Sequence, residues 1–340
     1  MKKYLLGLLA LVLVFAMVGP VFAGGQGEAG SDKLVIGLSL PTQREARWVS
    51  DKETMEAYAK EKGVDLRVAV ADADMAQQAS QVENLLAQGI DVLILAPHDA
   101  SAAASLVAKA DAEGIPVISY DRLITNTDKL DLYISFDNVK VGELQGEWLT
   151  KQVPEGDYII MSGAPTDNNA RLFKQGAMKF IQPLIDSGKI NVVADQAVDN
   201  WLPANALNIV ENALTASGNQ VDAILAPNDG TAGGAIVALE AQGLAGQVPV
   251  TGQDSEAAAA KRIMEGTQGM TIFKDTRLLG RAAIDAAIQM AQGNKPTTNA
   301  TTDNFSIKVP SNLLTPYVVT KDNLQELLID SGYLSADVLN

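Results

Sequence analysis

The sequence predicts an α/β protein with two lobes, each built around a parallel sheet. From Lys33 onward, short apolar segments rich in β-branched residues alternate with longer amphipathic segments. This alternation is typical of parallel sheets that carry helices on both faces. About eleven expected strands are too many for one open sheet, and the series is interrupted at Asp137-Asn138. We therefore expect two lobes joined by short segments. Lobes connected in this way move relative to each other about a hinge.

The expected strands are continuous apolar runs, as strands buried on both faces are. They are Leu34–Leu40, Asp65–Val70, Val92–Ala96, Val117–Tyr120, Leu132–Phe136, Tyr158–Met161, Asn191–Ala194, Ala223–Ala226, Val248–Thr251, Met270–Phe273 and Tyr317–Val319. Helical patterns separate most of them, among them Asp51–Lys62, Gln77–Gln88, Ala100–Glu113, Val139–Gln152, Ala204–Ala216, Thr231–Gln242 and Thr276–Gln292.

The N-terminus has the pattern of an export signal. Lys2 and Lys3 precede the apolar segment Leu5–Val18, and Val21–Ala23 follows as a cleavage region. A membrane anchor is the alternative, but the apolar segment is shorter than the roughly 20 residues of a membrane span. We therefore expect a signal peptide over residues 1–23 and a flexible leader over residues 24–32.

Composition excludes several classes of function. The net charge is −15, and removal of the signal peptide leaves 24 basic against 41 acidic residues. This acidic balance argues against nucleic acid and against an anionic membrane surface. Cysteine is absent and His98 is the single histidine, which excludes disulfides, thiolate catalysis and metal sites built from Cys or several His. Dinucleotide-binding, P-loop and nucleophile-elbow motifs are also missing, so we expect neither an enzyme nor a cofactor.

Polar residues follow the expected strands where these strands end. In open α/β sheets, ligands bind in the crevice outside the carboxyl ends of the strands. Helix capping is the alternative for about half of these positions, Asp229 and Asp275 among them. Capping does not explain Arg122, because arginine is not among the residues preferred as N-caps. The groups are Tyr120-Asp121-Arg122, Phe136-Asp137-Asn138, Pro227-Asn228-Asp229, Gly252-Gln253-Asp254 and Phe273-Lys274-Asp275.

Two of the three tryptophans occupy expected loops. Trp48 follows the first strand, and Trp201 lies between a strand and a helix, whereas Trp148 fits the packing face of a helix. An aromatic plane suits the C–H face of a sugar ring. The alternative is that each loop tryptophan caps the core of its own lobe.

Charges of both signs are expected at the crevice. Arg47, Arg122 and Lys274 accompany Asp121, Asp167 and Asp254, with Asn169 and Asn228. A phosphate or dicarboxylate site would need an excess of cations. A mixture of donors and acceptors suits a neutral polyol, whose hydroxyls both donate and accept hydrogen bonds.

At these positions the chain resembles the periplasmic sugar-binding proteins of ABC transporters. The resemblance runs from about Leu34 to the last helix. It rests on Ala46–Trp48, Ser119–Arg122 (SYDR), Tyr133–Asn138, Pro165–Ala170 (PTDNNA), Val198–Pro203 (VDNWLP), Asn228–Ala235 (NDGTAGGA), Thr251–Asp254, Lys261-Arg262, Gly266–Gln268 and Leu313–Pro316.

The resemblance implies a periplasmic-binding-protein fold, with two Rossmann-like lobes joined by a three-segment hinge. The crossings fall near Asp137-Asn138, Phe273-Lys274 and Val309–Leu313. The N-terminal lobe would comprise residues 33–138 and 274–310, and the C-terminal lobe residues 139–273 and 311–340.

The resemblance also implies which residues contact a sugar, with Trp201 as the stacking platform. They are Arg47, Trp48, Asp121, Arg122, Asp167, Asn169, Trp201, Asn228, Asp254 and Lys274. D-xylose is the first expected ligand. The segments Pro41–Ala46 and Pro97–Ala100 look closer to relatives that bind several aldoses, so a glucose, galactose and xylose binder is the alternative.

The implied biology is capture of a monosaccharide in the periplasm by a monomer and its delivery to an ABC permease. A chemoreceptor is a second possible partner, and the sequence does not separate the two roles. A sugar-responsive repressor core shares this fold, but an export signal stands where its DNA-binding segment would be. An enzyme acting on carbohydrate remains a further alternative.

Overall fold

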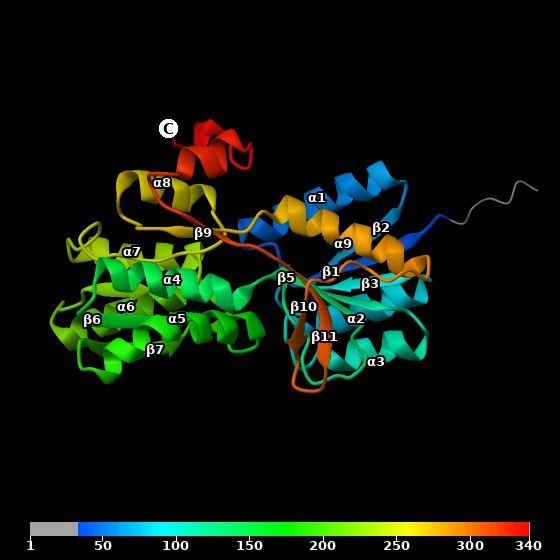
Figure 1. The fold of residues 1–340 in the computed structure, drawn as a ribbon, viewed down its shortest axis with the longest axis horizontal. Coiled ribbons are helices and arrows are strands. Elements are labelled where there is room, and N and C mark those ends of the chain that lie inside the picture. Colours follow the sequence, from blue (N-terminus) through cyan, green and yellow to red (C-terminus); the bar gives the residue numbers. More distant parts are fainter. Residues whose placement is uncertain (1–32, 340) are drawn as a thin grey trace, which may run out of the picture. The chain divides into compact units, whose positions relative to one another are not determined.

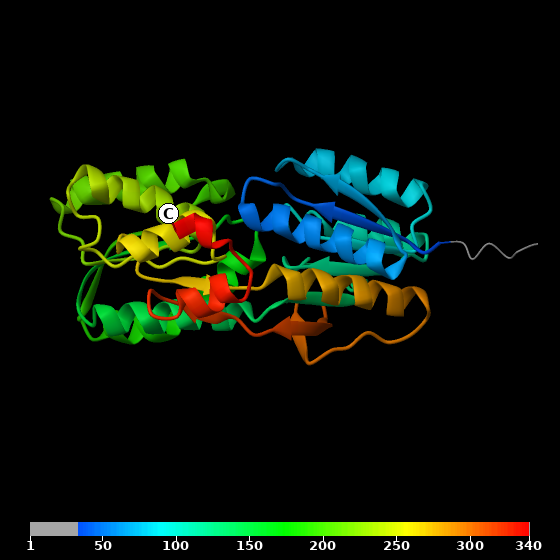
Figure 2. The same ribbon diagram turned by 90° about the horizontal axis from the view of Figure 1, so that it is seen from above.

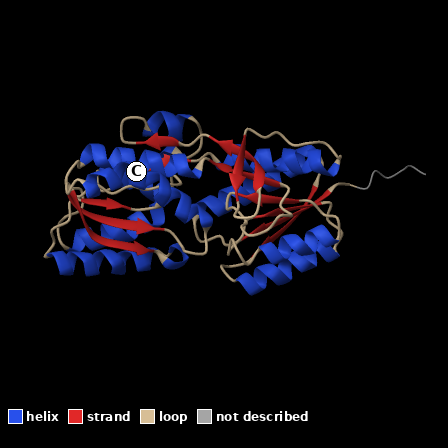
Figure 3. Ribbon diagram, turned by 60° about the horizontal axis from the view of Figure 1, so that its bottom comes forward, coloured by secondary structure: helices blue, strands red, loops and turns tan. Residues whose placement is uncertain are grey.

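The computed structural model describes residues 33–339. The predicted signal peptide and the predicted leader lie outside the described residues. Residues 34–339 belong to one compact unit, within which two lobes are visible (Figure 1). Helices lie on both sides of the sheet in each lobe (Figure 3).

The first lobe is built on a seven-stranded sheet with the order β10-β11-β5-β4-β3-β1-β2. All neighbours are parallel except β10 and β11, which form an antiparallel hairpin at one edge. The strands are β1 (Val35–Leu40), β2 (Asp65–Val70), β3 (Val92–Leu95), β4 (Val117–Tyr120), β5 (Leu132–Phe136), β10 (Ala300–Asp303) and β11 (Lys308–Leu314).

Both faces of this sheet carry a hydrophobic core because successive side chains of a strand point to opposite faces. Ile94 of β3 packs in the core formed with α1 (Ala46–Lys62) and α9 (Thr276–Ala291). Its neighbours Leu93 and Leu95 pack in the core formed with α2 (Met75–Ala87) and α3 (Ala104–Ala112). The central strand is therefore apolar along its whole length, as the sequence predicts.

The second lobe is built on a three-stranded parallel sheet with the order β7-β6-β8. Helices α4 and α5 cover one face, and α6 and α7 pack with the core of the other. The elements are α4 (Asn138–Gln152), β6 (Gly156–Ser162), α5 (Asn168–Asp186), β7 (Ile190–Ala197), α6 (Pro203–Ser217), β8 (Ala223–Leu225) and α7 (Asp229–Ala241).

Glycines allow α4 and α5 to approach closely. A Cβ on Gly142 would lie 1.8 Å from the carbonyl oxygen of Phe173, and a Cβ on Gly176 would lie 2.0 Å from that of Val139. Any larger residue at either position would push the helices apart. The start of α5, which carries Asn169, is thereby fixed against the start of α4.

Three connections join the two lobes. They leave β5 for α4 at residues 136–138, β9 (Thr271–Phe273) for α9 at residues 273–276, and β11 for β12 (Tyr317–Val319) at residues 314–317. β9 and β12 pair with each other as a two-stranded antiparallel sheet. We propose lobe boundaries at these connections. The third differs from the expected boundary at residue 310, because β11 stays paired with β5 in the first sheet as far as Leu314.

The C-terminal segment packs beside α8 (Ala257–Glu265), where it is drawn in red in Figure 2. Leu324 and Leu328 are buried there against Ile263 and Phe273. The ring of Tyr333 contacts the ring of Phe273 edge-on at 4.7 Å, so this segment covers the second crossing.

Among residues 33–339, no helix is both long and apolar enough to cross a membrane.

Candidate ligand-binding site

A cavity lies between the lobes, at the carboxyl ends of the strands. About 320 Å³ of space not filled by atoms, part of it open to solvent, lies among its lining residues. All ten residues that we predict to contact a ligand line this cavity. Their binding of a ligand is still a prediction. The complete lining is Glu45, Arg47, Trp48, Asp121, Arg122, Asp167, Asn169, Phe173, Trp201, Asn228, Gln253, Asp254 and Lys274.

Arg47 is the centre of a buried network on the first lobe. It lies in the first turn of α1, where the sequence predicts a loop. Its Nε and Nη2 donate to Oδ2 of Asp51 at 3.1 and 2.9 Å, and its Nη1 donates to Asp121 at 2.7 Å. Tyr120 donates its hydroxyl proton to the second carboxylate oxygen of Asp51. The guanidinium is thus fixed in one orientation at the cavity wall.

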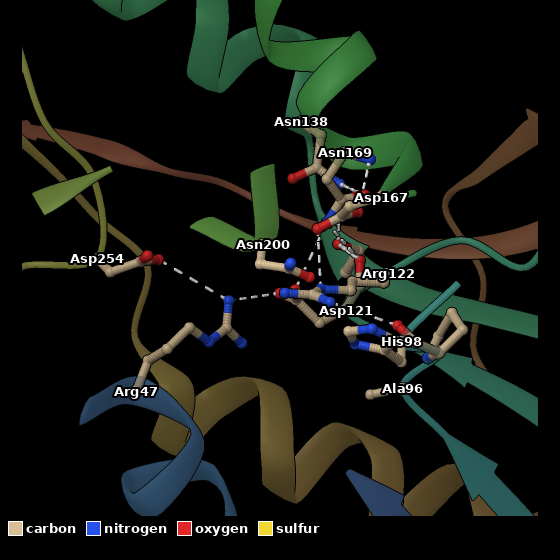
Figure 4. Close-up of polar contacts among 12 residues, drawn as sticks. Arg47, Ala96, His98, Asp121, Arg122, Asn138, Asp167, Asn169, Asn200 and Asp254 are labelled. Atoms are coloured by element: carbon tan, nitrogen blue, oxygen red, sulfur yellow. Dashed lines mark hydrogen bonds and ion pairs between the residues drawn. The ribbon is translucent and has the colours of Figure 1, made fainter. Parts of the chain in front are cut away.

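Polar contacts also join the two lobes across the cavity (Figure 4). Nε of Arg122 lies 2.8 Å from a carboxylate oxygen of Asp167. Nδ2 of Asn169 donates to the carbonyl oxygen of Asp121 at 3.0 Å. Both second-lobe residues lie at the start of α5, where Asp167 also accepts the backbone N–H of Asn169 as the helix N-cap. The structure therefore shows the lobes in contact around the site.

Lys274 and Asp254 form a second pair at the hinge side. Nζ of Lys274 lies 3.0 Å from Oδ1 of Asp254 and 4.0 Å from Asp121. Arg47 reaches the same Asp254 oxygen at 3.8 Å. Both side chains of the pair are buried. Cations and carboxylates therefore alternate around the cavity, with no excess of cations.

The protonation of the buried carboxyls follows from these contacts. Burial tends to raise the pKa of Asp121, but Arg47 and Lys274 outweigh this effect and hold that pKa below its usual value. Burial raises the pKa of Asp167, against the opposing effect of Arg122. The pKa of Arg47 is raised by Asp121 and Asp51 despite its burial, so its charge is secure.

The Trp201 ring forms an apolar wall of the cavity. It lies flat against the chain at Gly163, where a Cβ would come within 2.0 Å of the ring. The ring of Phe173 contacts it edge-on at 6.4 Å. The sequence predicts a loop here, and the structure has a short 3₁₀ turn, Asp199–Trp201.

Trp48 has a different environment. The guanidinium of Arg47 lies 4.5 Å and that of Arg122 lies 5.3 Å from its ring centroid. Both distances are within cation–π range. Trp48 therefore supports the two arginines as well as lining the cavity.

Asn228, which lines the cavity as predicted, is also the residue that caps α7 in place of Asp229. Asn228 is the N-cap of α7, where its Oδ1 accepts the backbone N–H of Thr231 at 2.9 Å. Asp229, which we expect to be a cap, is instead the first helical residue and is fully buried. It accepts hydrogen bonds from Gln268, Thr271 and the backbone of Glu256. Asp275 caps α9 as predicted.

Several polar atoms at this cavity lack hydrogen-bond partners. Among the residues that the structure describes, eight buried side-chain atoms are unpartnered, and four of them belong to residues of the lining. A buried polar atom without a partner costs about 1–3 kcal/mol. Asp254 Oδ1 has the ion-pair contact to Lys274 but no hydrogen bond. The four atoms are Glu45 Oε2, Trp201 Nε1, Gln253 Oε1 and Asp254 Oδ1.

Three lining residues were not predicted from the sequence. Gln253 follows the same expected strand as Asp254, so its place in that strand-end group was a usable signal. Phe173 stands four residues after Asn169, which places both on one face of α5. Glu45 directly precedes α1, which begins at Ala46 and not at Asp51 as the sequence predicts.

His98 lies outside the lining. Burial and the nearby Arg122 lower the pKa of its imidazole. Within residues 33–339, no group of three or more His, Asp or Glu side chains is arranged to hold a metal ion.

Comparison with known proteins agrees with this architecture. The family model described as periplasmic binding protein domain matches residues 36–295. The D-xylose-binding periplasmic protein of Escherichia coli (strain K12) is 46% identical over 305 residues, which cover 90% of this chain and 92% of that protein. The multiple sugar-binding periplasmic receptor ChvE of Rhizobium radiobacter is 39% identical, with 97% of both chains covered.

A solved structure shows the same similarity. It is a carbohydrate transporter solute-binding protein from Chloroflexus aurantiacus in complex with D-glucose. Its TM-score is 0.86 at 36% sequence identity, and the match covers 90% of this chain and 98% of that one.

Proposed function

The chain belongs to the periplasmic binding protein domain family, and we propose that it captures a monosaccharide between its two lobes for delivery to an ABC-type importer. Its fold is the periplasmic-binding-protein fold, as predicted. D-xylose is the first proposed ligand, because a relative named a D-xylose-binding periplasmic protein is 46% identical over 90% of this chain.

The observation that carries the proposal is the set of unpartnered polar atoms at the cavity. Trp201 Nε1 is a donor, whereas the oxygens of Glu45 and Gln253 are acceptors; Oδ1 of Asp254 already has Lys274 at 3.0 Å. A ligand that satisfies both kinds must itself accept and donate. Sugar hydroxyls do both, and a flat indole ring beside them suits the C–H face of a pyranose.

Charge supports a neutral ligand over an anionic one. Arg47, Arg122 and Lys274 are each matched by a carboxylate within 3.0 Å. An anion would have to displace one of these partners and leave a buried carboxylate unpaired, which is strongly unfavourable. A neutral polyol can use the remaining hydrogen-bonding capacity of the pairs without breaking them.

Binding and release, without turnover, is the proposed activity. Each sugar contact that spans the lobes would favour the closed form, so the ligand shifts the population toward closure. The periplasm is the proposed compartment, by analogy with relatives named for it. An ABC permease is the proposed partner, and a monomer the proposed state.

A second candidate is a receptor for several aldoses that also signals through a chemoreceptor. The 39% identity to ChvE, which is named a multiple sugar-binding periplasmic receptor, favours it. The two candidates differ in the breadth of sugars bound, which a titration measures directly.

The decisive experiment titrates the protein, without its predicted signal peptide, with D-xylose, D-glucose, D-galactose, L-arabinose and D-ribose. Tryptophan fluorescence reports binding because two of the three tryptophans line the cavity. Calorimetry gives affinity and stoichiometry. Tight binding of D-xylose alone supports the first candidate, and comparable binding of several sugars supports the second. Absence of binding to all five would discard both.

A further inference from the structure

The β10–β11 hairpin presents an exposed aromatic ring that neither the core nor the turn requires. Phe305 stands in the loop of this hairpin and is 60% exposed. Its φ is +70°, in the left-handed region that bulky residues rarely adopt. A glycine or asparagine would form the same turn with less strain. The reason for a phenylalanine at this position must therefore lie in what its ring contacts.

The hairpin loop is firmly attached to the first lobe. The neighbouring Asn304 is fully buried, and its Nδ2 donates to the carbonyl oxygen of Thr127 at 2.8 Å. Its backbone oxygen accepts the N–H of Asn126 at 2.8 Å. The N–H of Phe305 itself donates to Asp303 at 2.7 Å. The backbone that carries the ring is therefore held in place by the first lobe, at the sheet edge that carries β10 (Figure 1).

The ring contacts the opposite lobe. The guanidinium of Arg171, on the first turn of α5, lies 5.1 Å from the Phe305 ring centroid. Arg171 is fixed in turn by its Nε, which donates to Oδ1 of Asn168 at 3.0 Å. The same helix start carries Asp167 and Asn169 of the ligand cavity, so the ring touches the element that carries two proposed ligand contacts.

This contact lies on a second interlobe cavity, beside the ligand site. Phe305 and Arg171 line it together with Asp167, which also lines the ligand cavity. A backbone hydrogen bond of 2.9 Å from Ala100 to Thr166 joins the lobes at the same place. The Phe305–Arg171 contact is thus at the seam of the lobes and outside the ligand cavity.

We propose that Phe305 is a positioning residue for ligand retention, which stacks on Arg171 only when the lobes are closed and slows release of the ligand without touching it. The proposal rests on the proposed function. An interaction present only in the closed form increases the closed population. It therefore acts mainly on the dissociation rate.

The experiment is stopped-flow fluorescence of the mature chain with D-xylose, or with the sugar that the titration selects. Phe305→Ala is expected to raise the dissociation rate about two- to fivefold, as for an exposed cation–π pair, with the association rate unchanged. Arg171→Gln is expected to give the same increase, and the double variant no further increase. Val237→Ala, 52% exposed on α7 and outside both cavities, is the matched control.

Three outcomes would overturn the proposal. One is a dissociation rate in Phe305→Ala equal to the wild-type rate. Another is a double variant in which the two single effects multiply fully. The third is a second sugar per chain in wild-type protein that Phe305→Ala abolishes, because the ring would then be a ligand platform.

A readout of the lobes themselves separates failure of this proposal from failure of the proposed function. The chain has no native cysteine, so Glu113→Cys and Glu240→Cys place spin labels on exposed sites of the two lobes. If wild-type protein binds none of the sugars, the proposed function fails. The distances between the spin labels then test the Phe305–Arg171 contact on their own. Longer interlobe distances in Phe305→Ala support the proposed contact, and an unchanged distribution overturns it.

Discussion

Three residues of the cavity lining adopt a backbone conformation that non-glycine residues rarely use. The φ angles are +57° at Asp121, +58° at Trp201 and +95° at Asp254. Each backbone N–H is nevertheless held, for example that of Asp121 by Ile134 at 2.8 Å and that of Asp254 by Ile272 at 2.9 Å. Such strain persists only where the surroundings fix it, and it is common at ligand sites. The proposed contact groups are therefore set in place before a ligand arrives.

Trp201 is the residue where the stacking role can be tested. We expect Trp201→Ala to weaken sugar binding roughly 10- to 100-fold, about 1.4–2.8 kcal/mol, because the apolar wall of the cavity is lost. Trp201→Phe should lose less, since a smaller ring remains against Gly163. Calorimetry measures the affinity and circular dichroism checks the fold. Normal affinity in a folded Trp201→Ala variant would refute the stacking assignment.

Asp51 is a residue whose role only the structure reveals. It does not line the cavity, yet it holds two nitrogens of Arg47. We expect Asp51→Asn to raise the sugar dissociation constant about tenfold, because two of the three hydrogen bonds that orient Arg47 lose their charged acceptor. Tyr120→Phe, which removes only the hydroxyl bound to Asp51, should have a smaller effect in the same titration. Equal affinity in Asp51→Asn and wild type would show that Arg47 needs no such support.

At the scale of elements, the buried strands were the most predictable part. β2, β4 and β5 have the bounds that the sequence predicts. β4 and β5 are continuous apolar runs buried inside the sheet, whereas β2 is a half-buried edge strand that contains Asp65 and Arg67. The edge hairpin β10–β11 was not predicted: β10 is a polar sequence at the sheet edge, and β11 contains Pro310. Val248–Thr251 is wrong as a strand, since only Val250 forms a bridge, to Ile224.

The candidate site was predictable where its residues follow a strand. The group at Asp121-Arg122 stands directly after β4, so strand-end reasoning located it. The start of α1 was placed at Asp51 instead of Ala46, because Glu45 lacks the side-chain cap that marks a helix start in sequence. Arg47 and Trp48 are candidates already from residue type, as a cation at the crevice and a loop tryptophan, and only the structure shows that both lie in the first turn of a helix.

The start of α1 has an unusual partner from the other lobe. Glu256 lies beside this helix start and lines a small pocket together with Ala46 and Arg47. Burial, together with the charges of Asp254 and Glu45, raises the pKa of Glu256 to about 7, while Arg262 opposes the shift. In an open form the carboxyl would be hydrated, and its pKa would fall back toward the ordinary value of a glutamate.

This contact predicts pH-dependent sugar binding. A raised carboxyl pKa means that the closed form holds more protons than the open form between about pH 4 and 7, so closure is favoured as pH falls through this range. We expect affinity at pH 6 to exceed that at pH 8 by up to roughly tenfold. Glu256→Gln keeps the size of the side chain but cannot ionise, so it should bind more tightly than wild type at pH 8. Parallel pH profiles for the two proteins would contradict the assignment.

At the scale of the whole molecule, the site belongs to neither lobe alone. Arg47, Asp121 and Arg122 come from the first lobe, whereas Asp167 and Asn169 come from the second. The lobes each have their own cores, on both faces of their sheets. A ligand bound between the lobes should therefore couple the unfolding of two lobes whose cores are otherwise separate.

That coupling gives a prediction for thermal unfolding. A sugar at 100 times its dissociation constant stabilises the folded protein by about 2.7 kcal/mol. With an unfolding entropy of about 2.1 cal/mol/K per residue, a chain of this size should gain roughly 4 °C in its unfolding midpoint. Because the proposed sugar contacts lie on both lobes, the whole calorimetric transition should move together. Asp121→Ala, which removes a central contact, should lose most of the shift at the same sugar concentration. A shift confined to part of the transition would mean that the sugar binds one lobe only, and that the closed site is not the binding form.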